Sequence, residues 1–300
     1  MPRLAIIGPT ASGKSALALA YARAVPGVEL VSVDSMQVYR GMDIGTAKPT
    51  TAERDAVAHH CLDLAEPTEE VTVVRFQAAA AAAAEAIAAR RHQALLVGGS
   101  GLYLRAVVDR LDPPGQWPDV RADIEGEPDT IALHRRLSEI DPVAAERIEP
   151  TNRRRVVRAL EVCVGSGRAF SSFGPGLDRY PPTDVIQVGL RWPRRPLAQR
   201  IEERFDEQLA AGWLDEVARL APRPLSRTAS QALGYRELFD HLEGRRSLDE
   251  ARSLALARTR RFAVRQERWF RRDPRIRWFD VDGDPLVVLP ALLAEETACA

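Results

Sequence analysis

The sequence predicts an α/β fold: a P-loop-type parallel sheet with helices on both faces and a helical insertion domain. Short apolar runs alternate with helical patterns, which is typical of a parallel sheet covered by helices. The first of these runs leads directly into the glycine-rich stretch GPTASGKS. From about residue 120 to residue 168 the pattern is helical and rich in Arg and Glu, with no convincing strand. This last segment is therefore predicted to be an insertion.

Five apolar runs are the candidate strands, and three longer segments are candidate helices. The strands are predicted at RLAII (3–7), VELVSV (28–33), ALLVGG (94–99), VIQVGLRW (185–192) and IRWFD (276–280). The helices are predicted at Lys14–Val25, Val73–Arg91 and Leu248–Arg271. The second of these contains seven consecutive alanines, and alanine is the strongest helix former.

Pro/Gly-rich stretches bound the helical insertion and predict the domain limits. They are DRLDPPGQWPD, SSFGPG and RYPPTD. We expect residues 1–112 to form the first part of the P-loop core and residues 113–182 to form the insertion domain. Residues 183–300 then form the second part of the core, with the C-terminal helices.

Composition limits the class of protein. Lys+Arg and Asp+Glu are both 42 in a chain of 300 residues, so a nucleic-acid site would have to be a local patch. The three cysteines are far apart and form no CxxC pair, which argues against a zinc site or a disulfide framework. No apolar run is long enough to cross a membrane. We therefore expect a cytoplasmic protein that does not contact membranes. A monomer is a separate expectation, which these observations do not address.

The stretch GPTASGKS matches the phosphate-binding P-loop pattern. Gly8, Gly13, Lys14 and Ser15 occupy its defined positions, between an apolar strand and a helix. The glycines let successive backbone N–H groups converge on an anion, and the helix N-terminus adds partial positive charge. Lys14 is expected to reach the phosphates, and the Ser15 hydroxyl is suited to ligating Mg²⁺.

Missing features narrow the reaction without settling it. No NKxD segment for guanine is present, and ALLVGG ends in glycine instead of the acid that many ATPases place there. The candidate acid is Asp34, which ends VELVSVD and is either catalytic, a Mg²⁺-shell residue or structural. Three classes remain open: a group transferase, a small-molecule kinase whose helical insertion acts as a lid, and a noncatalytic RNA-binding module.

Six motifs in order carry a resemblance to a known family. They are GPTASGKS, VDSMQVYRGMDIGTAKPT, LLVGGSGLYLRAV, RRVVRALEV, ALGYRE and RQERWFRR. With them the sequence resembles tRNA dimethylallyltransferase, the isopentenyltransferase family that prenylates tRNA, from Leu4 to about Trp278. The resemblance implies that the loop holds the diphosphate of dimethylallyl diphosphate and that no nucleoside triphosphate is consumed.

The resemblance also assigns roles at the reacting centre. The diphosphate is expected to contact Gly8, Thr10, Ala11, Ser12, Gly13, Lys14 and Ser15, with Arg236 of LGYRE as an arginine clamp and Mg²⁺ as cofactor. The nucleophile is the exocyclic amine of the adenine on the 3′ side of the anticodon. Asp34 is expected to orient this amine and to take its proton.

Contacts to the tRNA anticodon stem-loop are expected from several segments. The residues implied are Asp34, Ser35, Met36, Gln37, Ser100, Arg121, Arg154, Arg155, Arg158, Gln231, Arg265 and Gln266. Local basic density agrees, because NRRRVVR places Arg154 and Arg158 on one helix face and RTRRFAVRQERWFRRDPRIR interleaves arginines with aromatic residues. The alternative is a solvated arginine-rich face with aromatic core contacts.

The chain departs from the family pattern at a few positions. Ser100 stands where Thr is common and keeps the hydroxyl, Arg153 and Arg154 replace an Asp-x-Gln, and Val264 replaces a lysine. Lys48 of GTAKP contacts phosphate or, preferably, ties down the loop after Asp34. The adjacent His59 and His60 are expected to be structural.

Overall fold

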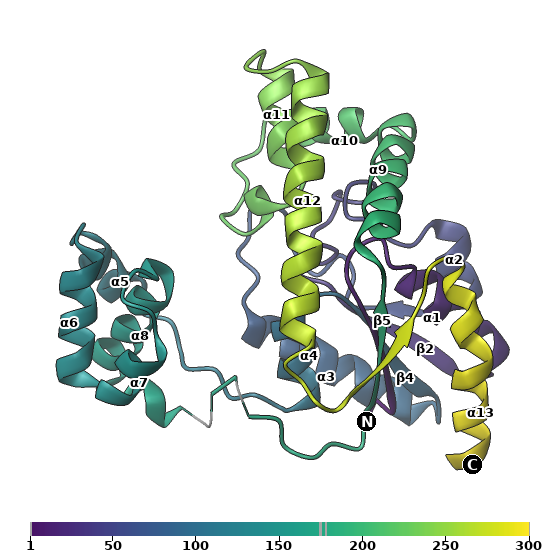
Figure 1. Ribbon diagram of the computed structural model, residues 1–300, viewed down its shortest axis with the longest axis horizontal. Coiled ribbons are helices and arrows are strands. Elements are labelled where there is room, and N and C mark those ends of the chain that lie inside the picture. The colour runs from purple at the N-terminus through teal and green to yellow at the C-terminus, as the bar shows by residue number, and fades with distance from the viewer. Residues whose placement is uncertain (1, 174–175, 178, 300) are drawn as a thin grey trace. The chain divides into compact units, whose positions relative to one another are not determined.

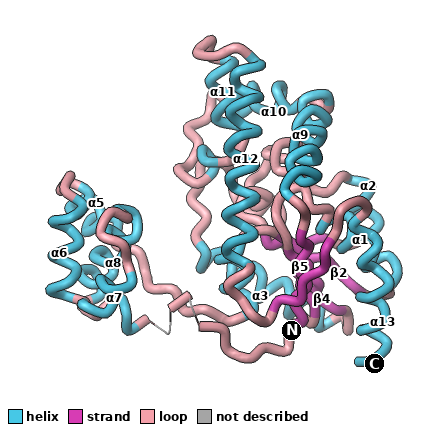
Figure 2. Tube along the Cα trace, viewed as in Figure 1, coloured by secondary structure: helices cyan, strands magenta, loops and turns pink. Residues whose placement is uncertain are grey.

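The chain forms two compact units. The computed structural model describes residues 2–173, 176–177 and 179–299, with side chains through residue 294. One unit, the core unit, comprises Met1–Arg110 and Pro182–Ala300, and the other, the inserted unit, is Leu111–Pro181. These limits lie within two residues of those expected from the sequence. Figures 1 and 2 show the elements of each unit. Gly174 and Pro175 of the predicted SSFGPG linker lie outside the described residues.

A six-stranded parallel sheet organises the core unit. In chain order its strands are β1 (Leu4–Ile7), β2 (Val28–Val33), β3 (His59–His60), β4 (Gln93–Gly98), β5 (Ile186–Arg191) and β6 (Ile276–Asp280). Their order across the sheet is β3-β2-β4-β1-β5-β6, and every adjacent pair is parallel. All six residues of β2 are buried, as expected where helices cover both faces.

Register brings the carboxyl ends of the central strands together. Ile7 of β1 pairs with Gly98 of β4 and with Gly189 of β5, and Val33 of β2 also pairs with Gly98. A Cβ atom on Gly98 would lie 2.0 Å from the Val33 carbonyl oxygen, so only glycine fits there. Loops that follow β1, β2 and β4 therefore leave the sheet side by side, where α/β proteins bind their ligands.

Helices cover both faces of this sheet. The core-unit helices are α1 (Lys14–Ala24), α2 (Thr51–Ala56), α3 (Val73–Ala89), α4 (Gly101–Val108), α9 (Arg194–Ala210), α10 (Trp213–Leu220), α11 (Tyr235–Leu242), α12 (Leu248–Phe270) and α13 (Leu289–Cys299), with 3₁₀ turns η2 (Ala229–Gln231) and η3 (Pro285–Val288). Helices α1 and α13 pack together on one side, and α3, α4 and α12 lie on the other (Figure 1).

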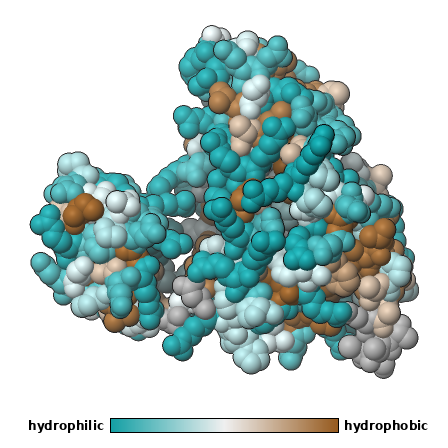
Figure 3. Space-filling view, in the orientation of Figure 1, coloured by the Kyte–Doolittle hydropathy of each residue, from teal (hydrophilic) through white to brown (hydrophobic). Residues whose placement is uncertain are grey.

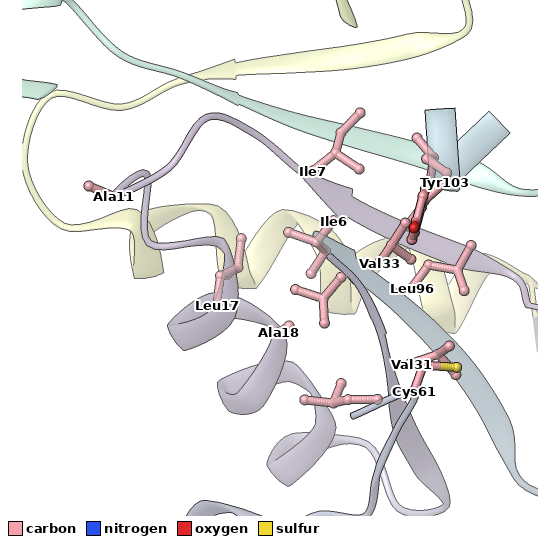
Figure 4. Packing of buried hydrophobic residues seen from close by; sticks show 14 of the residues in the cluster. Ile6, Ile7, Ala11, Leu17, Ala18, Val31, Val33, Cys61, Leu96 and Tyr103 are labelled. Atoms are coloured by element: carbon pink, nitrogen blue, oxygen red, sulfur yellow. The ribbon is translucent and has the colours of Figure 1, made fainter. Parts of the chain in front are cut away.

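The core between β1 and α1 fixes the start of the phosphate loop. Ile6 and Ile7 are fully buried in β1, and Leu17 and Ala18 of α1 are fully buried against the sheet (Figure 4). Ile6, Ile7 and Leu17 each contribute about 1.5–3 kcal/mol through removal of apolar surface from water. The loop between these elements is therefore anchored at both ends.

The inserted unit has a hydrophobic core of its own. Its helices are α5 (Pro118–Glu125), α6 (Thr130–Ile140), α7 (Pro142–Arg147) and α8 (Arg153–Ser166), followed by the turn η1 (Phe170–Ser172). The buried cluster contains Ile124, Leu133, Leu137, Ala144, Ala145, Ile148, Val156, Val157, Ala159, Leu160 and Cys163. Val156, Leu160 and Cys163 recur at helical spacing, so one face of α8 forms the centre of this core.

Among the described residues, no helix combines the length and the apolar character that crossing a membrane requires.

Candidate active site

The phosphate loop runs from Gly8 to Ser15 between β1 and α1. Gly13 caps α1 with a φ of 82°, and Ala11 also adopts a positive φ of 62°. A Cβ atom on Gly13 would lie 2.3 Å from Cγ of Pro285, so glycine is required both by conformation and by the close approach of η3. The backbone thus has the turn that makes N–H groups converge on an anion.

Gln266 of α12 braces the loop from a distant part of the chain. Its Oε1 atom accepts a hydrogen bond of 2.9 Å from the Thr10 backbone N–H, and its Nε2 atom donates to the Gly99 carbonyl at 2.9 Å. Gln266 is 7% exposed, so both ends of the amide are used internally. Its expected contact with tRNA stays a prediction, and the structure places it as a brace between the loops after β1 and β4.

Two side chains that follow β5 hold the tip of the loop. Nε1 of Trp192 donates to the Ser12 carbonyl at 3.0 Å, and Nε of Arg200 donates to the Ala11 carbonyl at 2.9 Å. The Arg200 guanidinium also lies 4.7 Å from the centre of the Trp192 ring, within the range of a cation–π contact. The tip of the loop is therefore held by the residue that follows β5 and by α9.

Two cations and one carboxylate interact electrostatically at the loop. Desolvation by burial lowers the pKa of Lys14 to about 8, with the Asp34 charge raising it and the Arg204 charge lowering it further. Burial also lowers the pKa of Arg204, while Asp34 opposes that change. Arg204 donates a hydrogen bond to Thr10 Oγ1. A bound anion would offset the cost of holding these two cations together.

Asp34 stands at the end of β2, one residue after Val33. Its Oδ1 atom accepts a hydrogen bond of 2.8 Å from the Met36 backbone N–H, which folds the chain into an Asx turn. The next residue, Ser35, donates its N–H to Ser100 Oγ at 3.0 Å. The predicted residues Asp34, Ser35, Met36 and Ser100 are therefore brought together by the parallel β2–β4 pair.

Gln37 is committed to the loop that follows Asp34. Its Nε2 atom donates to the carbonyls of Thr46 and Ala47 at 3.1 and 2.9 Å. Its Oε1 atom accepts from Ser32 Oγ at 2.7 Å. Gln37 therefore organises the backbone around Asp34, and its expected contact with the target base stays a prediction.

Lys48 ties down the same loop. Its buried Nζ atom donates to the Tyr39 carbonyl and to the carboxylates of Asp43 and Asp63, each carboxylate contact being 2.6 Å. All three partners belong to the protein itself. The structural role of Lys48, one of the two expected from the sequence, is the one that the structure shows.

Arg236 and Arg204 differ in their surroundings. Arg236, the expected clamp, is exposed in the first turn of α11, and its side chain forms no hydrogen bond or ion pair within the described part of the chain. Arg204, which sequence reasoning missed, contacts the phosphate loop directly. A signal was present: Arg200 and Arg204 are one turn apart in a helix that follows the strand beside β1.

The donor atoms at the loop fit Mg²⁺. Ser15 is exposed in the first turn of α1. The negative charge of the Asp34 carboxylate acts on Lys14 and raises its pKa. No cluster of three or more His, Cys, Asp or Glu side chains suited to a metal exists among the described residues. A few hard oxygen ligands suit Mg²⁺, which keeps several waters and binds together with substrate phosphates.

In the inserted unit, two of the predicted arginines are engaged by one buried acid. Glu161 is 2% exposed and pairs with Arg158 at 2.9 Å and with Arg121 at 3.3 Å. It also accepts a hydrogen bond from the Trp117 backbone N–H at 2.9 Å. Arg121 and Arg158 therefore hold α5 and α8 together, and their expected contacts with tRNA stay predictions.

The first turn of α8 presents two exposed arginines. Arg154 and Arg155 form no hydrogen bond or ion pair through their side chains within the described residues. They stand at a helix N-terminus, where the helix dipole disfavours cations and favours anions. Two free guanidinium groups at such a place are suited to phosphate groups.

Exposed arginines also line α12. Arg265 is exposed and lies 5.6 Å from the centre of the Phe262 ring, and Gln231 is exposed at the end of η2. A cavity of about 520 Å³ opens beside α12, and its lining includes Arg194 and Arg268, whose side chains form no hydrogen bond or ion pair within the described residues. In Figure 3 hydrophilic residues cover much of the visible face of the core unit.

The fold and the site define a P-loop α/β protein whose loop is braced by long-range contacts and faced by two cations and a carboxylate. A profile of the IPP transferase family matches residues 37–273, and the chain belongs to this family. The family resemblance and the fold class expected from the sequence are thereby confirmed.

Known relatives resemble the chain over nearly its whole length. A tRNA dimethylallyltransferase of Kineococcus radiotolerans is 51% identical, covering 95% of this chain and 93% of its own. A tRNA dimethylallyltransferase of Streptomyces coelicolor is 47% identical, covering 96% of this chain and 93% of its own. The full-length tRNA isopentenylpyrophosphate transferase structure from Bacillus halodurans has a TM-score of 0.71, with 37% identity over 98% and 95%. The structure of a eukaryotic dimethylallyltransferase acting on tRNA has a TM-score of 0.82, with 26% identity, covering 99% of this chain and 79% of its own.

These relatives are transferases that act on tRNA, so the alternative of a small-molecule kinase is not favoured.

Proposed function

We propose that this protein transfers a dimethylallyl group from dimethylallyl diphosphate to the exocyclic N6 amine of the adenine on the 3′ side of the tRNA anticodon, releasing diphosphate. The observation that carries the proposal is the meeting of Lys14, Arg204 and Asp34 at the phosphate loop of a chain in this family. This arrangement holds an anionic leaving group and a proton acceptor at one site.

The loop and its cations act on the leaving group. As the bond between the allylic carbon and the diphosphate oxygen breaks, the electron pair stays with the diphosphate and its negative charge grows. Lys14, Arg204 and the loop N–H groups face that charge in a partly desolvated site, where fixed donors are most effective. When bound by Ser15, Mg²⁺ would supply further charge neutralisation on the diphosphate.

Asp34 acts on the nucleophile. The adenine amine is a weak nucleophile because its lone pair is delocalised into the ring. A carboxylate that accepts a hydrogen bond from the amine orients it and takes the proton released as the new nitrogen–carbon bond forms. The Asx turn with Met36 occupies Oδ1 and fixes the orientation of this carboxylate.

RNA recognition falls to the exposed arginines. An adenine inside a structured loop must leave its stack before an enzyme can reach its amine, and contacts to the surrounding phosphates hold the RNA meanwhile. Arg154 and Arg155 in the inserted unit, and Arg265 and Arg268 on α12, are exposed cations available for this purpose. Every group in this scheme comes from a single chain, so we propose that the protein acts as a monomer. Because its substrate is tRNA, we also propose that it acts in the cytoplasm.

Mass spectrometry of tRNA nucleosides tests the proposal. After incubation of purified protein, Mg²⁺, tRNA and dimethylallyl diphosphate, we expect a new adenosine heavier by one dimethylallyl group. Asp34→Ala should lower turnover by about 10²- to 10⁴-fold while tRNA affinity changes little, because loss of a general base acts mainly on the transition state. Unmodified tRNA, together with ATP-dependent phosphorylation of a small acceptor, would contradict the proposal.

A further inference from the structure

A buried carboxylate outside the phosphate loop holds three consecutive backbone N–H groups. Glu216 of α10 is 2% exposed, and its Oε2 atom accepts from the N–H groups of Asp43 and Ile44, both at 2.8 Å. Its Oε1 atom accepts from the Gly45 N–H at 3.2 Å and from the Tyr235 hydroxyl at 2.6 Å. Successive N–H groups that converge on one anion form a nest, which here is filled by the protein's own side chain.

Tight packing accompanies this nest. A Cβ atom on Gly45 would lie 2.1 Å from Nε1 of Trp213, so the backbone approaches the indole too closely for any other residue. The Trp213 ring also meets the Tyr235 ring edge-on, with centres 5.6 Å apart and planes at 74°. The segment that Glu216 holds is therefore fixed in position as well as in shape.

The held segment leads to Asp34. The carbonyls that immediately follow it, those of Thr46 and Ala47, accept from Gln37 Nε2. Gln37 in turn accepts from Ser32, two residues before Asp34 on β2. Movement of the segment 43–45 would thus be passed through Gln37 to the turn that carries the carboxylate.

The same segment also leads to Arg204. Gln208 of α9 donates its side-chain amide to the Ile44 carbonyl. Arg204 lies one helical turn earlier on α9, where it contacts the phosphate loop at Thr10. The segment 43–45 is therefore bonded directly to the helix of the cation that faces the leaving group. It is also linked, through the carbonyls of Thr46 and Ala47, to Gln37, three residues after Asp34.

We propose that Glu216 is a positioning residue that sets the distance and orientation between Asp34 and Arg204. This inference rests on the proposed prenyl transfer. Glu216 touches neither substrate and acts through the backbone of residues 43–45. Because misplacement of reacting groups by about 1 Å can cost roughly 10²-fold in rate, its removal should affect the chemical step more than binding.

Steady-state kinetics of three variants test this role. In Glu216→Gln an amide oxygen and an NH₂ group face four donors, so we expect kcat to fall about 10- to 100-fold with the KM values for donor and tRNA within threefold. Gln208→Ala removes only the link to α9 and should lower kcat about 3- to 10-fold. Gln199→Ala is the matched control, because Gln199 lies on the same helix but donates to Glu203. It should leave kcat unchanged.

Stabilisation by inorganic pyrophosphate separates positioning from misfolding. Wild-type protein, Glu216→Gln and Gln208→Ala should all show the same rise in Tm with pyrophosphate, because the phosphate loop is held by other residues. If wild-type protein modifies tRNA and Glu216→Gln keeps its kcat within twofold, the inference is wrong while the proposed function stands. If Glu216→Gln loses the pyrophosphate response, Gln208→Ala decides, and an unchanged kcat in that variant overturns the inference. Wild-type protein that transfers no dimethylallyl group would instead overturn the proposed function itself.

Discussion

At the scale of single residues, Lys14 links burial to substrate binding. Its amino group is partly desolvated, which lowers its pKa to about 8, so a fraction of the protein carries a neutral lysine in mildly alkaline solution. A diphosphate binds best to the charged form. The affinity for the donor should therefore depend on pH in a range where most lysines do not titrate.

The pH dependence of donor binding checks this. Between pH 7 and 9.5 the Kd for dimethylallyl diphosphate should be nearly constant at first and should rise about tenfold for each pH unit well above 8, measured by calorimetry. Lys14→Arg is the control, because an arginine stays charged throughout this range and should remove the dependence even if binding is weaker. A wild-type Kd that stays constant to pH 9.5 would contradict the assignment of Lys14 to the diphosphate.

The two candidate arginine clamps can be separated by substitution. Arg204→Ala should lower kcat/KM for the donor by about 10²-fold, because a half-buried guanidinium at the phosphate loop is lost. Arg236→Ala removes an exposed side chain and should change the same ratio by less than threefold. Kinetics at saturating tRNA make the comparison, and the reverse order of effects would restore Arg236 as the clamp.

At the scale of secondary-structure elements, helix α8 divides its arginines between two tasks. Replacing Arg154 and Arg155 with alanine should weaken tRNA binding and reduce the slope of log K against log salt by about 1 to 2, because two phosphate contacts are lost. Arg158→Ala should instead lower Tm, since it leaves Glu161 buried with one partner fewer. Binding isotherms at several salt concentrations measure the slope, and an unchanged slope would remove Arg154 and Arg155 from the RNA surface.

The folding stability contributed by the edge of the sheet near β3 depends on pH through one acid, Glu29. Glu29 of β2 is nearly buried, and the hydrogen bond from Arg90, together with those to His60 and His92, lowers its pKa from 4.5 to about 2. Since the pKa is lower in the folded protein, the stabilisation is present above about pH 4.5 and is lost as the pH falls toward 2. At neutral pH it amounts to roughly 3 kcal/mol.

Urea unfolding at several pH values measures this contribution. Wild-type protein should lose stability between pH 4.5 and 2 more steeply than Glu29→Gln, which cannot titrate at this position. The difference in the free energy of unfolding between the two proteins should therefore shrink as the pH falls. A difference that is constant down to pH 2.5 would show that Glu29 is not held in its charged form.

Most elements could be predicted because their signals are local. The predicted helix Val73–Arg91 is found as Val73–Ala89, where Thr72 caps the helix and an alanine-rich sequence continues it. Strand β3 was missed because it is two residues long and exists only through pairing with Leu30 and Val31. His59 and His60 carry no apolar pattern that would indicate a strand.

At the scale of the whole molecule, the separate core of the inserted unit predicts independent folding. A fragment of residues 111–181 should be helical and should unfold cooperatively, because its buried side chains pack on one another. Circular dichroism during heating measures this. A broad transition without a baseline would show that the unit needs the core unit in order to fold.

The candidate site could be predicted only in part, for a physical reason. The phosphate loop and Asp34 follow strands β1 and β2, so sequence motifs suffice to place them together. Gln266 and Arg204 reach the loop across separations of 256 and 194 residues. The spacing of Arg200 and Arg204 marks them as a pair on one helix face, but contact with the loop depends on the packing of α9 and α12 over the sheet, which no local pattern encodes.

The contact between Pro285 and Gly13 also bears on when the phosphate site can form during translation. A ribosome makes the phosphate loop well before it makes Trp192, Gln266 and Pro285. A growing chain therefore exposes an unsupported loop until these residues have been added. The binding site for dimethylallyl diphosphate is complete only after strand β6 has joined the sheet and η3 has packed on Gly13. A chain whose translation stops before that point should therefore not bind the diphosphate.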